Sequence, residues 1–542
     1  SQAEIIFCSL FFCSEQTMKG ISIMKLNIIY KNARCAVAEC IDGSIFQLGK
    51  KYDVYVNGVK TKETDRVIFS LYGLKPQTMY TVEIKDGEET AAWAVFTTDY
   101  EFVTLNVRDF GAKGDGVNND TSFIQAAIMA CPKDSRVLIP EGVYKVTSLF
   151  LKDDVKIELE KGAVLEAYTD RTMFPIFPEA VQSYDEEKEY ILGTWEGNPL
   201  PMFSAIITGV NVKNAVLYGE GILDGKAGKE EGNWWNNPKV MNIAFRPRMI
   251  FLNQCENIVV QGITVQNSPS WNIHPFFSNH LRFLDLSVLN PKDSPNTDGL
   301  DPESCRDLEI AGVYFSLGDD CIAVKSGKIY MGAKYRTPSE DITIRQCCMR
   351  DGHGSVTIGS EMAGGVKNLI VKDCLFLHTD RGLRIKTRRG RGKDAIIEGV
   401  LFDNIHMDHV MTPFVANSFY FCDPDGHTEY VRTKEALPVD DRTPDIRSLT
   451  FRNIQADNCH VAAAFFYGLP EQKIGRVEMS NVRVNYAAET QTGVPAMMEG
   501  VEPMTRSGLF AANIKTLVLH NVEIQGQDGE AMVLEHIDQI ES

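Results

Sequence analysis

The sequence lacks several features that would assign it to a specialised class of protein. The apolar run Ile5–Cys13 is too short to span a bilayer, and it lacks the preceding basic residues and the following small residues of a signal peptide. Positive charge is also scarce, since 55 Lys and Arg stand against 73 Asp and Glu, giving a net charge of −18. This balance argues against a protein that coats nucleic acid or binds a membrane, and any anionic ligand requires a local basic patch.

The cysteines follow no regular pattern. Their number, 13, is odd, and their spacing fits neither a disulfide framework nor a zinc site. Together with the poor signal peptide, this favours a reducing, cytoplasmic setting, with secretion or a periplasmic location as the alternative. We expect neither a metal nor another cofactor, and the sequence gives no oligomeric state.

The first part of the chain reads as a small β domain over residues 25–98, preceded by an extension of uncertain status over residues 1–24. Short alternating runs such as Tyr52–Val56 and Thr81–Ile84 are separated by Gly and Asn turns. The segment Gly73–Val82 resembles the region around the tyrosine corner of fibronectin type III domains, with Tyr80 as the tyrosine. This resemblance implies a β-sandwich.

The rest of the chain, residues 102–542, contains a recurring pattern in which apolar residues alternate on both sides of a Gly, Asp, Asn or Gln turn position. The spacing of the repeats varies, which a β-solenoid tolerates because insertions enter its loops. The pattern therefore predicts an all-β fold, a right-handed parallel β-helix, whose first coil is covered by a helix over residues 120–131. The repeats start at Ile258, Leu281, Leu308, Ile342, Leu369, Ala395, Leu449, Val477 and Leu517.

Ionisable residues are concentrated in the loops after four consecutive repeats. Asp319 and His353 fall at the same offset from their repeat starts, and Asp298 and Lys386 share another offset, so in-register stacking predicts two columns of polar side chains. The four motifs are Asn296-Thr297-Asp298, Gly318-Asp319-Asp320, Gly352-His353-Gly354 and Arg384-Ile385-Lys386.

Three carboxylates beside a histidine and two cations predict acid/base chemistry on an anionic substrate. Glycoside hydrolysis needs one protonated carboxyl group to release the leaving oxygen and one ionised group to activate water. Because clustered carboxylates repel one another, we expect replacement of any of the three by Asn to leave thermal stability unchanged or higher.

In this order, the four motifs resemble the signature motifs of glycoside hydrolase family 28, the polygalacturonases, and residues 106–116 and 139–142 resemble the first coils of the same superfamily. The resemblance implies a β-helix that hydrolyses α-1,4 bonds between galacturonate residues with inversion and without a metal. It also implies Asp319 as general acid, with Asp298 and Asp320 activating water. By the same resemblance His353 supports protonation of the acid, while Arg384 and Lys386 bind a substrate carboxylate. The sequence itself does not decide which of Asp319 and Asp320 is the acid.

Further features favour a member that acts on chain ends. The N-terminal domain, a long insertion over residues 168–246 and the segment Trp271–Pro275 are similar to bacterial exopolygalacturonases. Arg388 and Arg389 lie in a basic stretch that continues from Lys386, so we expect both to bind additional galacturonate carboxylates. The remaining predicted substrate-binding residues are Asn296, Trp271 and His274, the last with a purely structural role as the alternative.

Other functions stay open at this point. Within the family, the alternatives are an endo-acting polygalacturonase and a rhamnogalacturonan or xylogalacturonan hydrolase. A pectate lyase would share the fold and the substrate but use Ca²⁺ and an arginine base. A non-catalytic β-helical carbohydrate-binding protein is the alternative from another class, and the grouped carboxylates disfavour it because they would repel a polyanion.

Overall fold

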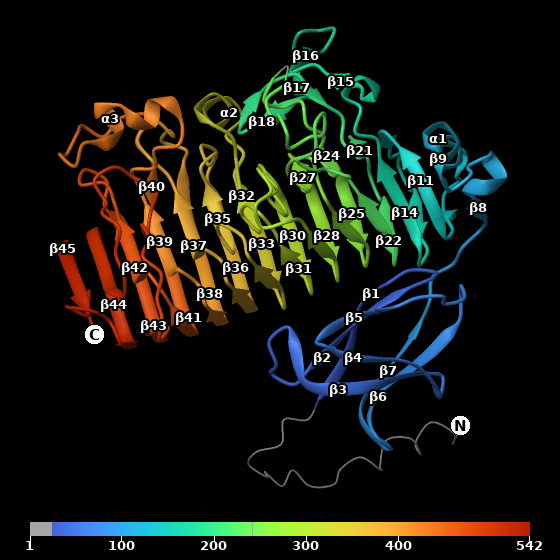
Figure 1. The fold of residues 1–542 in the computed structure, drawn as a ribbon, viewed down its shortest axis with the longest axis horizontal. Helices are drawn as coiled ribbons and strands as arrows, with labels where there is room; N and C mark the ends of the chain where they lie inside the picture. Colours follow the sequence, from blue (N-terminus) through green and yellow to red (C-terminus); the bar gives the residue numbers. More distant parts are fainter. Residues whose placement is uncertain (1–23, 241) are drawn as a thin grey trace, which may run out of the picture.

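The computed structural model describes residues 24–240 and 242–542, so nearly all of the predicted extension 1–24 lies outside the described residues. A small antiparallel unit stands beside an elongated stack of parallel strands (Figure 1). None of the helices in these described ranges is long and apolar enough to cross a membrane.

The small unit consists of two antiparallel sheets, and its hydrophobic core continues into Val259, Leu284 and Ala311 of the solenoid. The hydroxyl of Tyr80 accepts a hydrogen bond from the backbone N–H of Lys75 at 2.9 Å, which is the interaction expected of a tyrosine corner. One sheet contains β1 (Lys25–Lys31), β2 (Ala36–Ile41) and β5 (Ile68–Leu71), and the other contains β4 (Val59–Arg66), β3 (Gln47–Val56), β6 (Met79–Asp86) and β7 (Glu89–Thr97).

The solenoid is a right-handed parallel β-helix with three faces, as the sequence predicted. Strands of the first face include β8 (Thr104–Asn106), β10 (Arg136–Ile139), β13 (Lys156–Leu159), β22 (Val216–Gly219), β25 (Glu256–Gln261), β28 (Asn279–Leu284), β30 (Arg306–Ala311) and β33 (Ser339–Arg345). The second face includes β9 (Asp115–Asn119), β11 (Gly142–Val146), β14 (Ala163–Ala167), β23 (Ile222–Asp224), β26 (Thr264–Gln266), β29 (Ser287–Leu289), β31 (Tyr314–Ser316) and β34 (Cys348–Arg350).

The third face carries the loops of interest. Its strands are β12 (Leu149–Phe150), β21 (Ile207–Val210), β24 (Ile250–Asn253), β27 (Ile273–Phe276), β32 (Ile322–Val324), β35 (Val356–Gly359), β37 (Arg381–Lys386), β39 (Thr412–Asn417) and β42 (Ala462–Tyr467). The remaining strands of the stack are β36 (Val366–Leu377), β38 (Ile396–Asp408), β40 (Asp445–Ile446), β41 (Ser448–Cys459), β43 (Ile474–Tyr486), β44 (Ser507–Gln525) and β45 (Met532–Glu541).

The strand register confirms the predicted repeat with one correction. Ile258 pairs with Leu281, Leu281 with Leu308, and the series continues through Ile342 and Leu369. Leu369 then pairs with Val400, whereas the predicted start of the sixth repeat was Ala395. The sixth repeat therefore starts five residues later than predicted. In the sequence, Gly399 resembles the turn residue of this repeat because apolar residues already alternate at the start of the long strand β38. The residue at the turn position is Asn404, which has a φ of 55°.

The predicted helix is α1 (Thr121–Ala130), which packs Ile124, Ala127 and Ile128 into the end of the solenoid core. The carboxylate of Asp120 just before it accepts hydrogen bonds from the backbone of Lys113 and Gly114. The open end of the core is therefore covered, as expected for a solenoid.

The predicted insertion over residues 168–246 is not continuous. The regular strands β21, β22 and β23 interrupt it, because the run between residues 207 and 224 keeps the apolar alternation of a full coil. Its first part carries η2 (Arg171–Met173), β15 (Ile176–Phe177), β16 (Ala180–Gln182), β17 (Glu189–Ile191), β18 (Thr194–Trp195), β19 (Asn198–Pro199) and β20 (Met202–Phe203).

Several insertions lie along one edge of the solenoid, away from the small unit (Figure 1). The first part of the interrupted insertion lies there, together with α2 (Ile329–Tyr335), η3 (Pro424–His427) and α3 (Glu429–Arg432). The small unit packs instead on the first face, where Ser70 and Tyr72 hydrogen-bond to Gln261. The edge that carries the insertions therefore remains open to a ligand.

Candidate active site

A polar cavity of about 510 Å³ opens on the third face of the solenoid. This volume lies in the range of ligand-binding pockets. Among the residues predicted to act in a site, it brings together Trp271, Asn296, Asp298, Asp319, His353, Arg384 and Lys386. Its further lining residues are Glu196, Lys325, Ser360, Glu361, Asp380, Arg381, Tyr420, Cys422, Asp423 and Met497.

Only one of the two predicted columns forms. Ile322 pairs with Val356, which aligns Asp319 with His353 on adjacent coils. Leu300 instead bridges to Ile322, so Asp298 aligns with Asp320, and the partner of Lys386 is Gly359. The predicted Asp298–Lys386 column was wrong because the loop over residues 290–299 is longer than the loop that precedes Lys386, and equal offsets along the chain do not give equal positions on the third face.

The three carboxylates form one cluster. One oxygen of each of Asp298, Asp319 and Asp320 lies within 4.8 Å of the others. Burial raises the pKa of Asp298 well above its usual value, and the neighbouring Asp319 raises it further. In a pair of adjacent carboxyl groups, ionisation of one disfavours ionisation of the other. The pair can therefore offer one acid and one base.

Asp320 has a different environment. Its buried carboxylate accepts hydrogen bonds from Arg384 Nη1 at 2.9 Å and from Lys386 Nζ at 2.8 Å. Burial alone would raise the pKa of Asp320, but Lys386 and Arg384 outweigh it and hold the pKa well below its ordinary value. Asp320 is therefore ionised at neutral pH, and it fixes both cations at the floor of the cavity.

A cluster of three carboxylates also has the donor set of a divalent-cation site. Here, however, Asp320 is already neutralised by Arg384 and Lys386. An added cation would be repelled by these two side chains. The donor chemistry therefore fits a metal-independent acid/base site better than a Ca²⁺ or Mg²⁺ site.

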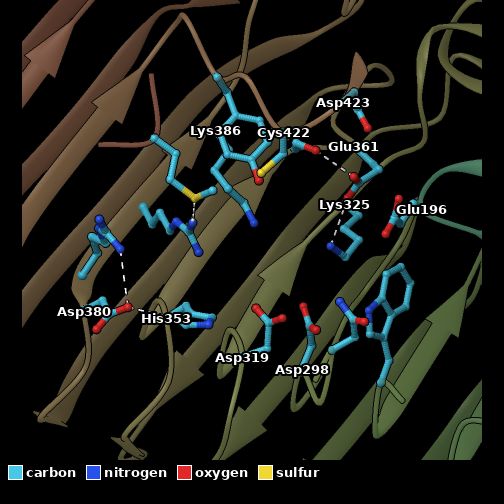
Figure 2. A pocket seen from close by; sticks show the side chains of 17 residues that line it. Glu196, Asp298, Asp319, Lys325, His353, Glu361, Asp380, Lys386, Cys422 and Asp423 are labelled. Carbon is cyan, nitrogen blue, oxygen red and sulfur yellow. Dashed lines mark hydrogen bonds and ion pairs between the residues drawn. The ribbon is translucent and has the colours of Figure 1, made fainter. Parts of the chain in front are cut away.

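His353 is oriented by a residue that the motif did not include. Its Nδ1 lies 2.8 Å from a carboxylate oxygen of Asp380, whose backbone precedes β37 (Figure 2). This hydrogen bond raises the pKa of His353, and Asp319 and Asp320 add to the effect. With Nδ1 bound to Asp380, the other ring nitrogen is the one free to act on the substrate or on Asp319.

We expect Asp380→Asn to lower kcat/KM about 10-fold at neutral pH and to move its alkaline limb to lower pH. The sign follows from the raised pKa of His353, because loss of the Asp380 carboxylate lets the imidazolium lose its proton at lower pH. A pH–rate profile of kcat/KM measures the shift. Asp457→Asn is the matched control, since Asp457 also pairs with a histidine, His406, at 3.0 Å but lies outside the cavity. An unchanged alkaline limb would contradict this role of Asp380.

The structure does not bring Arg388 and Arg389 to the cavity, which corrects the expectation that they bind substrate. Arg388 is buried and pairs with Asp423 at 2.8 Å and Asp425 at 2.9 Å. Arg389 is 1% exposed and binds Glu471 together with three backbone carbonyls. Both side chains hold the loop over residues 418–445 in place, since their charges are already compensated.

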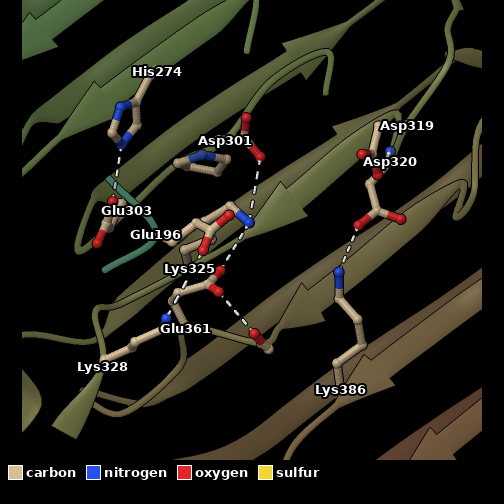
Figure 3. Close-up of polar contacts among 12 residues, drawn as sticks. Glu196, His274, Asp301, Glu303, Asp319, Asp320, Lys325, Lys328, Glu361 and Lys386 are labelled. Carbon is tan, nitrogen blue, oxygen red and sulfur yellow. Dashed lines mark hydrogen bonds and ion pairs between the residues drawn. The ribbon is translucent and has the colours of Figure 1, made fainter. Parts of the chain in front are cut away.

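His274 also lies outside the cavity. Its ring is fully buried, and its Nε2 lies 2.9 Å from Glu303 (Figure 3). Burial, together with Arg248 and Lys325, lowers the pKa of His274 well below its usual value, so the ring is neutral. This corresponds to the structural alternative for this histidine. Trp271 does line the cavity, although its ring is stacked on Trp195 with 5.2 Å between centroids.

The cavity also contains charged residues that sequence reasoning missed. Lys325 follows β32 and binds Glu361 at 3.0 Å, with Asp301 3.9 Å away (Figure 3). Its position was detectable, because Lys325 ends an apolar run that begins just after the Asp319–Asp320 motif. Glu196 gave no such signal, since it lies in an insertion far from the motifs.

Comparisons with known proteins give two matches to family models. Residues 133–500 match the family model described as "Glycosyl hydrolases family 28". Residues 104–159 match a second model, "Rhamnogalacturonase A/epimerase, pectate lyase-like".

The chain resembles proteins named for both modes of attack. It is 30% identical to a "Probable polygalacturonase" of Vitis vinifera over 74% of this chain and 79% of the relative. It is 29% identical to an "Endo-polygalacturonase" of Pectobacterium carotovorum over 67% of this chain and 84% of the relative. A solved family 28 exopolygalacturonase of Yersinia enterocolitica has a similar fold, with a TM-score of 0.68, 18% identity and coverage of 95% and 98% of the two chains.

Proposed function

Because the chain belongs to glycoside hydrolase family 28, we propose that it hydrolyses α-1,4 bonds between galacturonate residues with inversion and acts on chain ends. The observation that carries the chemistry is the cluster of Asp298, Asp319 and Asp320, of which Asp298 and Asp319 line a cavity that also contains cations, while Asp320 is buried beside them. A neutral sugar would not require these cations, whereas each galacturonate residue brings a carboxylate.

In the proposed mechanism Asp319 is the general acid and protonates the leaving oxygen. It is the least buried of the three carboxyl groups and neighbours His353, which favours a position beside the leaving residue. Asp298 and Asp320 then activate the water that attacks the anomeric carbon.

Arg384 and Lys386 retain donors for the substrate although both bind Asp320. A guanidinium has five N–H donors and an ammonium has three, whereas the contact with Asp320 uses one from each side chain. The remaining donors can bind the carboxylate of a galacturonate residue at the cleavage site.

A wall at one end of the cavity supports the exo mode. The turn Glu196–Gly197 joins β18 to β19, and the carbonyl of Gly197 accepts a hydrogen bond from the backbone N–H of Lys328 at 2.9 Å. Lys328 Nζ in turn lies 3.1 Å from Asp423 in the loop over residues 418–445. Lys328 thus links the hairpin to the loop over residues 418–445 across the third face, an arrangement that would obstruct a long polymer there.

The wall depends on Gly197. Its φ is 73°, and a Cβ at this position would lie 2.5 Å from the nitrogen of Lys328 and 2.8 Å from the carbonyl carbon of Gly327. Because both are backbone atoms, Gly197→Ala has to displace the hairpin.

We expect the native protein to release mono- or digalacturonate from the start while polymer viscosity falls slowly, and Gly197→Ala to produce intermediate oligomers. Chromatography of products over time on polygalacturonate measures this. Gly232→Ala is the control, since Gly232 also has a positive φ of 83° but open space around it. An early ladder of oligomers from the native protein would favour the endo alternative.

The hydrolytic reaction itself is tested with a chelator. We expect EDTA to leave the rate of reducing-end release unchanged, and no unsaturated product to accumulate, because Arg384 and Lys386 already neutralise the carboxylate cluster. Loss of activity on chelation, restored by Ca²⁺, together with ultraviolet absorbance from an unsaturated sugar, would indicate a lyase.

A further inference from the structure

The wall presents a carboxylate to the cavity in addition to blocking it. Glu196 occupies the first position of the two-residue turn between β18 and β19, with a φ of 45°, and Gly197 occupies the second. Turns of this geometry hold a side chain rigidly at the tip of a hairpin. Figure 2 shows Glu196 near Lys325 and Glu361, at the opposite end of the cavity from Asp380 and His353.

The neighbours of Glu196 are engaged more closely elsewhere. Lys328 Nζ lies 3.9 Å from Glu196 but 3.1 Å from Asp423, and Lys325 Nζ binds Glu361 at 3.0 Å. Burial raises the pKa of Glu196, and Glu361 raises it further. The side chain of Glu196 is 35% exposed, so its oxygens are accessible from the cavity.

This environment favours hydroxyl groups over carboxylates. At this end of the cavity Glu361 is paired with Lys325, and Asp423 is paired with Lys328, whereas Glu196 lies 3.9 Å from Lys328, so Glu196 is the carboxylate with the most capacity left to accept hydrogen bonds. Carboxylate oxygens are strong acceptors for sugar hydroxyls. A galacturonan chain can present hydroxyls without a further carboxylate only where it ends.

The position of the general acid determines whether the reducing or the non-reducing end of the galacturonan chain lies near Glu196. Asp319 and His353 lie on the side of the cavity away from Glu196, and the general acid faces the leaving residue. The galacturonate whose anomeric carbon is attacked therefore extends from Asp298 towards Glu196. Its non-reducing end lies against the wall. This step rests on the proposed exo-acting function with Asp319 as the acid.

We propose that Glu196 accepts hydrogen bonds from the hydroxyls of the non-reducing terminal galacturonate, including the hydroxyl at C4, and thereby selects chains with a saturated, unsubstituted end. A chain cut by a lyase ends in a 4,5-unsaturated residue that lacks the C4 hydroxyl. Such a chain would leave Glu196 without this hydrogen bond once the bound substrate excludes water from that end of the cavity.

The test compares saturated trigalacturonate with 4,5-unsaturated trigalacturonate as substrates. We expect the native protein to have a kcat/KM about 10- to 100-fold higher on the saturated substrate. In Glu196→Ala this preference should fall to within about 3-fold, through a higher KM on the saturated substrate, and Glu196→Gln should retain part of it. Glu187→Ala, an exposed glutamate of the same insertion outside the cavity, is the control and should keep the full preference.

The outcomes separate this inference from the proposed function. Equal kcat/KM of the native protein on both substrates, with mono- or digalacturonate still the first product, would overturn the role of Glu196 and leave the exo mode intact. An unchanged preference in a folded Glu196→Ala, with the native Tm, would also overturn it. An oligomer ladder from the native protein on polygalacturonate would reject the exo mode itself.

Discussion

Asp319→Asn and Asp298→Asn will each lower kcat by about 10²- to 10⁴-fold, the range expected for loss of a general acid or base. Both substitutions keep the shape of the side chain and remove the proton that the pair must exchange. Steady-state kinetics on oligogalacturonides measures the loss, and Asp293→Asn, an exposed neighbour on the loop that carries Asp298, is the control. Turnover within a few-fold of native would remove either residue from the mechanism.

Asp298→Asn will not reduce stability. Burial raises the pKa of Asp298 in the folded state, so the folded protein binds more protons than the unfolded chain above the ordinary aspartate pKa of about 3.9. Folding stability therefore falls as pH rises through this window. Asparagine stays neutral, so the Tm of Asp298→Asn should exceed the native value at pH 7, and this gain should disappear near pH 3.

Asp320→Asn will behave in the opposite way and destabilise the protein by about 3–5 kcal/mol at neutral pH, besides lowering kcat. Removing this carboxylate leaves Arg384 and Lys386 buried without their partner. The expectation from sequence, that loss of any of the three carboxylates leaves stability unchanged or higher, is thus reversed for Asp320. Urea or thermal unfolding measures the change.

The pH dependence of the Asp320 effect has a defined sign. Lys386 and Arg384, acting against burial, hold the pKa of Asp320 below its unfolded value. The stability that Asp320 contributes is therefore complete above about pH 4 and is lost as pH falls towards the folded pKa. The difference in Tm between native and Asp320→Asn should shrink in acid. A double variant with Lys386→Met should recover part of the stability, and a constant difference at all pH values would contradict the ion pairs.

The sequence was sufficient for the fold and for the grouping of the three carboxylates because both depend on local patterns. Alternating apolar residues define each strand, and a turn position such as Gly262 or Asp285 adopts a positive φ, as the pattern required. The motif carboxylates lie in loops of consecutive coils, so stacking the coils brings them together, although the unequal loop lengths place Lys386 out of line with Asp298.

The sequence was insufficient where a contact depends on residues from distant loops. Arg388 and Arg389 looked like ligands for an anionic polymer because their partners, Asp423 and Glu471, come from later loops whose path the repeat does not define. Glu196 was not predicted as a site residue because it too lies in an insertion whose path the repeat does not define. Asp380 was missed because a carboxylate before a strand is common, and only the structure shows that it contacts His353.

The stereochemistry of the first product tests the mechanism most directly. One oxygen of each carboxylate lies within 4.8 Å of the others, closer than the separation of roughly 6.5–9.5 Å usual in inverting glycosidases, so inversion requires Asp298 and Asp320 to share the attacking water. ¹H NMR of the earliest products from a galacturonate oligomer distinguishes the two outcomes. The mechanism predicts the β-anomer first, with the α-anomer appearing only through mutarotation. An α-anomer as the first product, or a 4,5-unsaturated sugar, would contradict it.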